Sequence, residues 1–410
     1  MTLTIATLSP KRERLLLWLL AFTQFTVIMD FMVMMPLAPQ LMRAFSVGTS
    51  AVSGAVSAYA WCAGLSGLFA ATYIDRFDRK RLLLTVFCLF ALSNLACALA
   101  PTFEVLLLSR AFAGLSGGIM GSIVMAVIAD VIPVERRGAA AGIVMTSFGM
   151  AAVAGVPTGI LLAAHFNWAA PFYVLVLASA VIWAGAWIVM PRLDAHLAAE
   201  PRPFSSVLPD LLGLFAVARH RRAFLLTGLT MMSGMMVVPF IAPVMVGNLG
   251  VQPVQMSWVY LCGGLATLFS ARAVGRWTDR IGPARTFGIA ASVSVLPILM
   301  LTHLPALPLA LIIPVFVLFM TANSSRIIPL QALLTTVPTP ARRGAFLSVN
   351  AAVQQLGSGL GAWIGGLVLS TDAAGHIAHY GISGWLAAAM AVAAVLQVRT
   401  VRPAEAVAAP

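Results

Sequence analysis

The chain has 410 residues, of which 60% are hydrophobic and only 9% are charged. Because ordinary soluble domains carry about 25% charged residues, this composition excludes a cytosolic enzyme, a disordered protein and a secreted disulfide scaffold. A net charge of +12 would indicate nucleic-acid binding in a soluble protein. Here nearly all basic residues lie in short gaps between apolar stretches, so we expect a membrane protein and no nucleic-acid partner.

A helix needs about 20 apolar residues to cross the hydrocarbon layer of a bilayer, and twelve stretches meet this requirement. In the first half the predicted spans are 15–37, 51–73, 82–100, 104–128, 139–164 and 169–190. In the second half they are 223–246, 255–275, 284–302, 306–334, 345–370 and 377–398. The predicted fold class is therefore an all-α membrane protein with twelve transmembrane helices.

The longest gap between spans, residues 191–222, is rich in proline and contains five arginines. It divides the twelve spans six and six. We therefore predict an N-terminal six-helix bundle over 1–190, a cytoplasmic linker over 191–222, and a C-terminal six-helix bundle with a short cytoplasmic tail over 223–410. Within the linker, a surface helix over 207–219 is an alternative to a fully solvated chain.

The distribution of basic residues predicts the orientation in the membrane. The gaps after odd-numbered spans contain only Arg43, whereas every gap after an even-numbered span is basic. By the positive-inside rule, both termini and the arginine-rich gaps are predicted to be cytoplasmic, in a multi-pass protein of the cell (inner or plasma) membrane. The basic residues of the even-numbered gaps are Arg76, Arg79, Lys80, Arg81, Arg136, Arg137, Arg192, Arg202, Arg219, Arg221, Arg222, Arg276, Arg280, Arg285, Arg342 and Arg343.

Two loops of the first half are repeated in the second half at nearly the same interval. Asp75 follows span two and Asp279 follows span eight, 204 residues later, and each precedes an arginine. Gly138 follows span four and Gly344 follows span ten, 206 residues later, and each ends an Arg-Arg-Gly string. Two matched pairs in corresponding gaps indicate two homologous, pseudo-symmetric halves.

With these loops, the chain resembles the major facilitator superfamily over its full length, which implies two six-helix bundles around a central cavity. The family's loop signature, G-x-x-x-D-R-x-G-R-K, is matched by Asp75, Arg76, Arg79 and Lys80, with Ala71 and Asp78 at its glycine positions. In the second half it is matched by Gly275, Asp279, Arg280 and Gly282, with Pro283 in place of an arginine. The resemblance implies a cytoplasmic latch formed by Asp75, Arg76, Arg79, Asp130, Asp279 and Arg280. Asp75 is also expected to be attracted by the helix dipole at the start of span eleven, near Gly344.

Span five contains the string Gly155-Val156-Pro157-Thr158-Gly159. It is similar to the glycine-proline motif of the drug:proton antiporter branch, with Val156 interrupting the Gly-Pro pair. Together with the Leu-Gly-Ser-Gly-Leu-Gly-Ala string at 356–362, it is similar to the arabinose-polymer and purine-nucleoside efflux group of that branch. Arg110 resembles the arginine of the family's fourth-helix motif, which implies a conformational or proton-relay role.

Ionisable groups at membrane depth are costly, and they are functional candidates for that reason. Of thirteen acidic residues, only Asp30 lies well inside a span. Burial favours the protonated form of a carboxylate, so Asp30 is the proton-coupling candidate. The alternatives are a structural hydrogen-bonding role and a fixed counter-ion to an arginine.

The candidates for the substrate cavity are Arg326, Arg110, Asn323 and Gln24. Arg326 is near the middle of span ten, where a guanidinium must face water or a partner, and its planar fork suits a carboxylate or a phosphate. Two roles remain open at this point. Arg326 either binds an anionic or polar substrate or pairs structurally with Asp30.

The predicted function is secondary active transport by alternating access, with proton-coupled efflux of a small drug-, sugar- or nucleoside-like compound as the leading form. A uniporter or a proton symporter that imports solute is the alternative, and a polytopic membrane enzyme or receptor is the alternative from another class. The sequence has no P-loop and no cluster of acidic or histidine residues, so we expect neither an enzyme nor an ATP-driven pump. We expect no metal, no cofactor besides the coupling proton, a monomer, and a small molecule and the lipid bilayer as partners.

Overall fold

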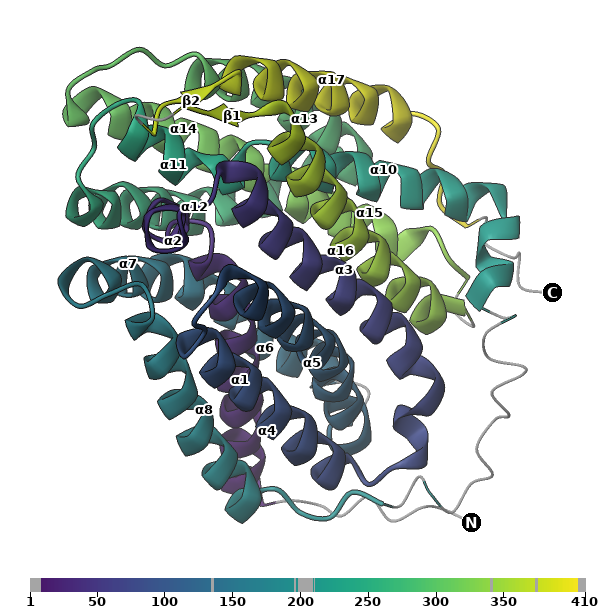
Figure 1. The fold of residues 1–410 in the computed structure, drawn as a ribbon. Coiled ribbons are helices and arrows are strands. Elements are labelled where there is room, and N and C mark those ends of the chain that lie inside the picture. The colour runs from purple at the N-terminus through teal and green to yellow at the C-terminus, as the bar shows by residue number, and fades with distance from the viewer. Residues whose placement is uncertain are drawn as a thin grey trace.

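The computed structural model describes residues 9–133, 136–194, 197, 209, 211–339, 342–372 and 375–404. Helices account for nearly all of this part of the chain (Figure 1), which confirms the predicted all-α class. Most of the predicted linker, with the first part of the alternative surface helix, lies outside the described residues. The described end of that region holds the 3-10 turn η5 (Leu214–Ala216).

In the first half the elements are α1 (Pro10–Val33), α2 (Ala38–Phe45), α3 (Thr49–Tyr73), η1 (Ile74–Arg76), α4 (Arg79–Ala98), α5 (Phe103–Val131), α6 (Arg137–Met150), the π-helical turn η3 (Ala151–Gly155), α7 (Val156–His165) and α8 (Ala170–Val189). In the second half they are α10 (Ala218–Met235), η6 (Val238–Phe240), α11 (Ile241–Gly247), α12 (Pro253–Ile281), α13 (Pro283–Thr302), α14 (Leu309–Ser325), α15 (Ile327–Thr336), α16 (Arg343–Val368), β1 (Ser370–Thr371), β2 (Ile377–Ala378) and α17 (Tyr380–Val398).

Several predicted spans are broken helices rather than straight ones. The first span was expected at 15–37, but α1 ends at Val33, and α2 follows a turn that contains Pro36. The seventh span breaks in the same way around Pro239, between α10 and α11. Proline has no amide hydrogen and its ring clashes with the preceding turn, so it interrupts a helix from within. These breaks lie at corresponding places in the two halves.

Eleven helical segments of the described chain are long and apolar enough to cross a membrane. The one predicted span not among them is the eleventh (345–370), which is α16; it has 26 residues but is richer in glycine, glutamine and serine. It packs between α3 and α10, so protein rather than lipid covers much of its surface. The glycines at positions 357, 361 and 365 are one turn apart, and a Cβ at each would lie 3.2 Å or less from the backbone of α10 or of Met236, the residue that follows it. Small residues at this spacing let membrane helices approach closely.

Three hydrophobic clusters show how the halves are joined. The largest contains residues of both halves around α2, α11 and the β1–β2 hairpin, which lie together at the left of Figure 1. We call this the hairpin end. At the opposite end, which carries the arginine-rich loops and which we call the basic end, one cluster belongs to the first half. The other belongs to the second half, with Leu68 of α3 packed against it. The two halves therefore share a core at the hairpin end and have separate cores at the basic end.

Candidate functional site

Asp30 of α1 forms an ion pair with Arg110 of α5, and both side chains are completely buried. The Arg110 guanidinium donates one hydrogen bond from Nη1 to the Asp30 carboxylate Oδ1 and another from Nη2 to the Asp30 backbone carbonyl, at 3.3 Å. The second carboxylate oxygen, Oδ2, has no hydrogen-bond partner among the described residues. Asp30 is therefore neutralised by Arg110. The alternative in which Arg326 pairs with Asp30 is wrong for this structure, because the first half supplies its own arginine.

Tyr59 of α3 completes this charged group. The guanidinium carbon of Arg110 lies 4.5 Å from the centre of the Tyr59 ring, an arrangement in which the ring face attracts the cation. A side chain at Gly114 would overlap the backbone of Tyr59, so this glycine lets α3 and α5 approach. Tyr59 was not among the predicted site residues, since an isolated aromatic residue in an apolar stretch carries no functional signal.

The antiporter-like motif of span five packs against α1 beside Asp30. Gly155 ends the π-helical turn η3, and Pro157 and Gly159 lie in the first turn of α7. A Cβ at Gly155 would lie 2.6 Å from the sulfur of Met29, and one at Gly159 would lie 2.6 Å from Cγ2 of Val33. The two glycines thus allow α1 to lie close to span five along the stretch that holds Asp30.

Arg326 lies in the second half, at the break between α14 and α15, and only 1% of its surface is exposed. Its guanidinium donates from Nη1 to the Ser233 hydroxyl at 3.0 Å and from Nη2 to the side-chain oxygen of Asn323. Its Nε has no partner among the described residues. Asn323 is half-buried one turn before it, and Gln24 is half-buried on α1, six residues before Asp30. The structure therefore groups Asn323 with Arg326, and Asp30 with Arg110.

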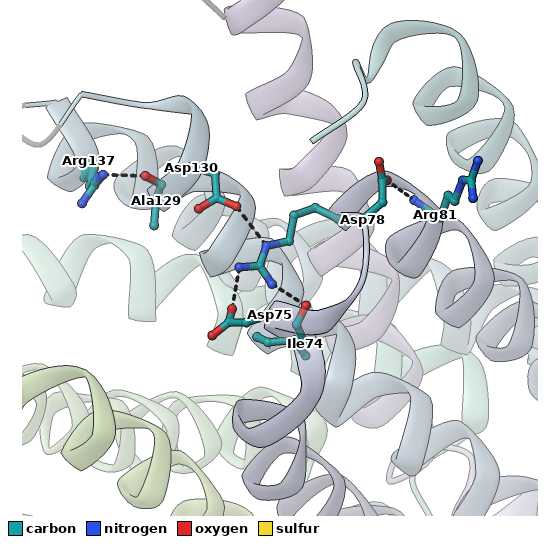
Figure 2. Close-up of polar contacts among 8 residues, drawn as sticks. Ile74, Asp75, Asp78, Arg81, Ala129, Asp130 and Arg137 are labelled. Atoms are coloured by element: carbon teal, nitrogen blue, oxygen red, sulfur yellow. Dashed lines mark hydrogen bonds and ion pairs between the residues drawn. The ribbon is translucent and has the colours of Figure 1, made fainter. Parts of the chain in front are cut away.

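The latch residues of the first half meet at the basic end. Arg79, at the start of α4, donates to Asp75 at 2.6 Å, to Asp130 at 2.9 Å and to the carbonyl of Ile74 at 2.6 Å. Figure 2 shows these three acceptors around one guanidinium. Arg79 is almost fully buried, whereas 68% of the Asp75 side chain is exposed. Arg79 therefore holds the end of α3 against the end of α5.

The corresponding loop of the second half is built differently. Asp279 and Arg280 are both exposed at the end of α12, and no ion pair joins either of them to another residue that the structure describes. Pro283, at the start of α13, occupies the place of Arg79. Arg76 is exposed in η1. Of the six predicted latch residues, the structure brings together Asp75, Arg79 and Asp130, and the contact expected between Asp75 and the start of α16 is absent from its described interactions.

Among the described residues, no three histidine, cysteine, aspartate or glutamate side chains are grouped closely enough to hold a metal ion. Three arginines are buried among the described residues: Arg79 and Arg110 are paired with acids, and Arg326 is not.

Comparison with known proteins places this arrangement in a family. The family model of the Major Facilitator Superfamily matches residues 20–229 and again residues 223–409. An uncharacterized MFS-type transporter, YfhI of Bacillus subtilis (strain 168), is 28% identical over 335 residues, which cover 80% of each chain. A probable sugar efflux transporter of Helicobacter pylori (strain HPAG1) is 29% identical over 181 residues, which cover 44% of this chain and 46% of that one.

Solved structures of the same architecture cover nearly the whole chain. The D-xylose-proton symporter superposes with a TM-score of 0.77 at 15% identity, over 95% of this chain and 98% of that one. The nucleoside transporter NupG superposes with a TM-score of 0.73 at 13% identity, over 95% and 99%. At these identities the likeness establishes the fold of two six-helix halves. With the double match of the family model, the chain belongs to the Major Facilitator Superfamily, and it is a multi-pass membrane transporter rather than an enzyme.

Proposed function

We propose that the protein exports a small organic compound from the cytoplasm in exchange for protons, with Asp30 as the group that carries the proton. The observation that carries this proposal is the fully buried Asp30–Arg110 pair, in which one carboxylate oxygen has no partner. A proton on that oxygen would remove the negative charge that holds Arg110. The ion pair is therefore a two-state element whose equilibrium depends on protonation.

The surroundings of the pair support coupling to a movement of the helices. Asp30 lies one turn before the end of α1, where the chain enters the core shared by the two halves. Its partner is on α5, which also carries Asp130 at the basic end. Loss of the charge pair would free α1 from α5, and the glycines of span five present no side chains to the stretch of α1 that would move.

The direction of transport is proposed from two resemblances. The halves share a core at the hairpin end and not at the basic end, which the positive-inside rule makes cytoplasmic, and exporters and importers both pass through states of this kind. A partial relative named as a probable sugar efflux transporter supports efflux, as does the resemblance of the span-five motif to that of drug:proton antiporters.

The test is transport in liposomes by purified protein under an imposed pH gradient, with a panel of dyes, sugars and nucleosides. We expect substrate-dependent proton movement by the wild type and none by Asp30→Asn, which keeps binding and exchange without a gradient. The matched control is Glu104→Gln, which removes an exposed acid at the start of α5 and should behave as the wild type. Gradient-driven accumulation by Asp30→Asn would exclude Asp30 as the coupling group, and uptake in the same direction as the proton would identify a symporter.

A further inference from the structure

Arg326 is a permanent positive charge in the interior, and it has no negative partner among the residues that the structure describes. Its contacts are the hydroxyl of Ser233 on α10 and the amide oxygen of Asn323 on α14, which are both neutral. None of the ion pairs among the described residues includes Arg326. Ser233 uses its own proton in a 2.9 Å hydrogen bond to the carbonyl of Ala387, so its oxygen can only accept from Arg326. The guanidinium therefore retains an N–H group, that of Nε, which no acceptor in the described part of the chain satisfies.

The buried arginine of the first half, Arg110, has a carboxylate partner in Asp30. Asp30 lies just before the break that ends α1, and Ser233 lies just before the corresponding break that ends α10. Each accepts a hydrogen bond from a buried arginine of the fourth span of its own half, Arg110 or Arg326. The two halves thus form similar contacts between their first and fourth spans, although Arg326 lies 216 residues after Arg110, about ten more than the interval of the repeat, and a hydroxyl accepts in the second half where a carboxylate accepts in the first.

A buried charge without a partner costs several kcal/mol, and breaking a buried pair is strongly destabilising for the same reason. A ligand that places a negative charge beside Arg326 removes this cost. The free energy recovered in this way adds to the affinity of the ligand. The guanidinium offers Nε and an Nη side by side, which matches the two oxygens of a carboxylate. One unpaired cation balances one negative charge, so a monocarboxylate fits this site better than a doubly charged phosphate ester.

We propose that Arg326 is the recognition site for the carboxylate of an anionic substrate, and that Ser233 and Asn323 hold the guanidinium in place until that substrate binds. This proposal rests on the proposed transport function and specifies its substrate class. Asn323 is half-buried and forms the more accessible side of the site. Gly234 lets α10 pack closely against this group, since a Cβ at this position would lie 3.2 Å from the Asn323 oxygen and 3.8 Å from Nη2 of Arg326.

The first test needs no substrate and measures thermal unfolding of purified protein in detergent. Arg326→Gln removes an uncompensated charge, so its unfolding temperature should equal or exceed that of the wild type. Arg110→Gln is the matched control, because it leaves Asp30 buried without a partner and should lower the unfolding temperature. A fall for Arg326→Gln as large as the fall for Arg110→Gln would show that Arg326 is a structural residue and would overturn the proposal.

The second test measures binding of glucuronate, gluconate and benzoate against glucose and benzamide, their uncharged counterparts, by the shift in unfolding temperature. The wild type should bind at least one of the carboxylates and bind its neutral counterpart about tenfold more weakly or worse, as expected for a hydrogen-bonded charge. Arg326→Gln should abolish this preference. If no carboxylate of the panel binds better than its neutral counterpart, the proposal is rejected.

Ser233→Asp provides a variant that does not depend on the tolerance of position 326. It places a carboxylate where the first half has one, so it should raise the unfolding temperature and prevent binding of the external carboxylates. Continued carboxylate binding by Ser233→Asp would contradict the proposal. Because these measurements use no proton gradient, carboxylate binding without proton-driven transport would refute the proposed coupling alone, whereas proton-driven transport of only neutral compounds would refute the role of Arg326 alone.

Discussion

Ser57 of α3 donates a hydrogen bond of 2.9 Å to the backbone carbonyl of Gly359 in α16, and this bond joins the two halves of the protein. Nearer the hairpin end, the hydroxyls of Thr49 and Thr371 lie 3.2 Å apart. The hairpin that carries Thr371 is fastened to Asn248, which accepts from the amide of Ile377 at 2.8 Å and donates to its carbonyl at 2.7 Å. The hairpin end is thus closed by polar contacts as well as by the shared core.

This closure should be trapped by a disulfide. With Thr49→Cys and Thr371→Cys in a background without the four native cysteines, oxidation should stop transport and reduction should restore it, because the halves must separate at this end during the cycle. The measurement is substrate flux in liposomes before and after oxidation. Each single cysteine variant is the control and should be insensitive to oxidant, and undiminished flux through the cross-linked protein would show that the hairpin end does not open.

The Asp30–Arg110 pair should behave as one unit in stability measurements. Removal of one member of a buried pair leaves the other charge uncompensated, which costs about 3–5 kcal/mol. Asp30→Asn and Arg110→Gln should each lower the unfolding temperature, and the double variant should recover much of the loss. A double-mutant cycle by thermal unfolding checks this, and simple additivity of the two losses would mean that the pair is not coupled.

Arg79 should stabilise the basic end of the first half. Its guanidinium satisfies two carboxylates and a backbone carbonyl, and Lys offers no planar fork for three acceptors. Arg79→Lys should therefore lower the free energy of unfolding nearly as much as Arg79→Gln does, by about 1.5–3 kcal/mol, the range for hydrogen bonds to charged groups. Thermal unfolding provides the measurement, with Arg81→Gln as control because the Arg81 side chain is exposed. Wild-type stability of Arg79→Gln would exclude this role.

The orientation can be checked with fusions to a reporter that is active only outside the cytoplasm. Fusions after Gly250 or Thr371 should be active, since both positions lie at the hairpin end, whereas fusions after Lys80 or Pro203 should be silent. Activity after Pro203 would place an odd number of spans in the first half and contradict the arrangement of six and six.

The sequence predicted the fold well because the signals for it are local. A stretch of about 20 apolar residues must cross the bilayer wherever it occurs, and arginines beside it are retained in the cytoplasm without regard to the rest of the fold. The breaks within spans one, seven and ten were not predicted. A proline in an apolar stretch can kink a helix or merely end it, and the position of the break depends on the neighbouring helices.

The candidate site was likewise predicted only in part from the sequence. From the sequence, Asp30, Arg110 and Arg326 stand out because charged residues are rare at membrane depth. The sequence could not predict which arginine pairs with Asp30. Three helices separate Asp30 from Arg110 along the chain, and Arg326 lies in the other half. Only the packing of α1 against α5 brings one of them to the acid. Tyr59 was missed for the same reason, because its role depends on what lies above its ring.

The sequence by itself therefore determined the number of spans, the repeat and the short set of charged residues, and it predicts the orientation, because each follows from local composition and spacing. The tertiary structure alone decided the partners. It paired Asp30 with Arg110, it joined Arg79 to Asp75 and Asp130, and it left Arg326 beside neutral groups. The physical reason is that an ion pair depends on a distance of a few ångströms between helices, and that distance is set by the packing of many side chains along their whole length.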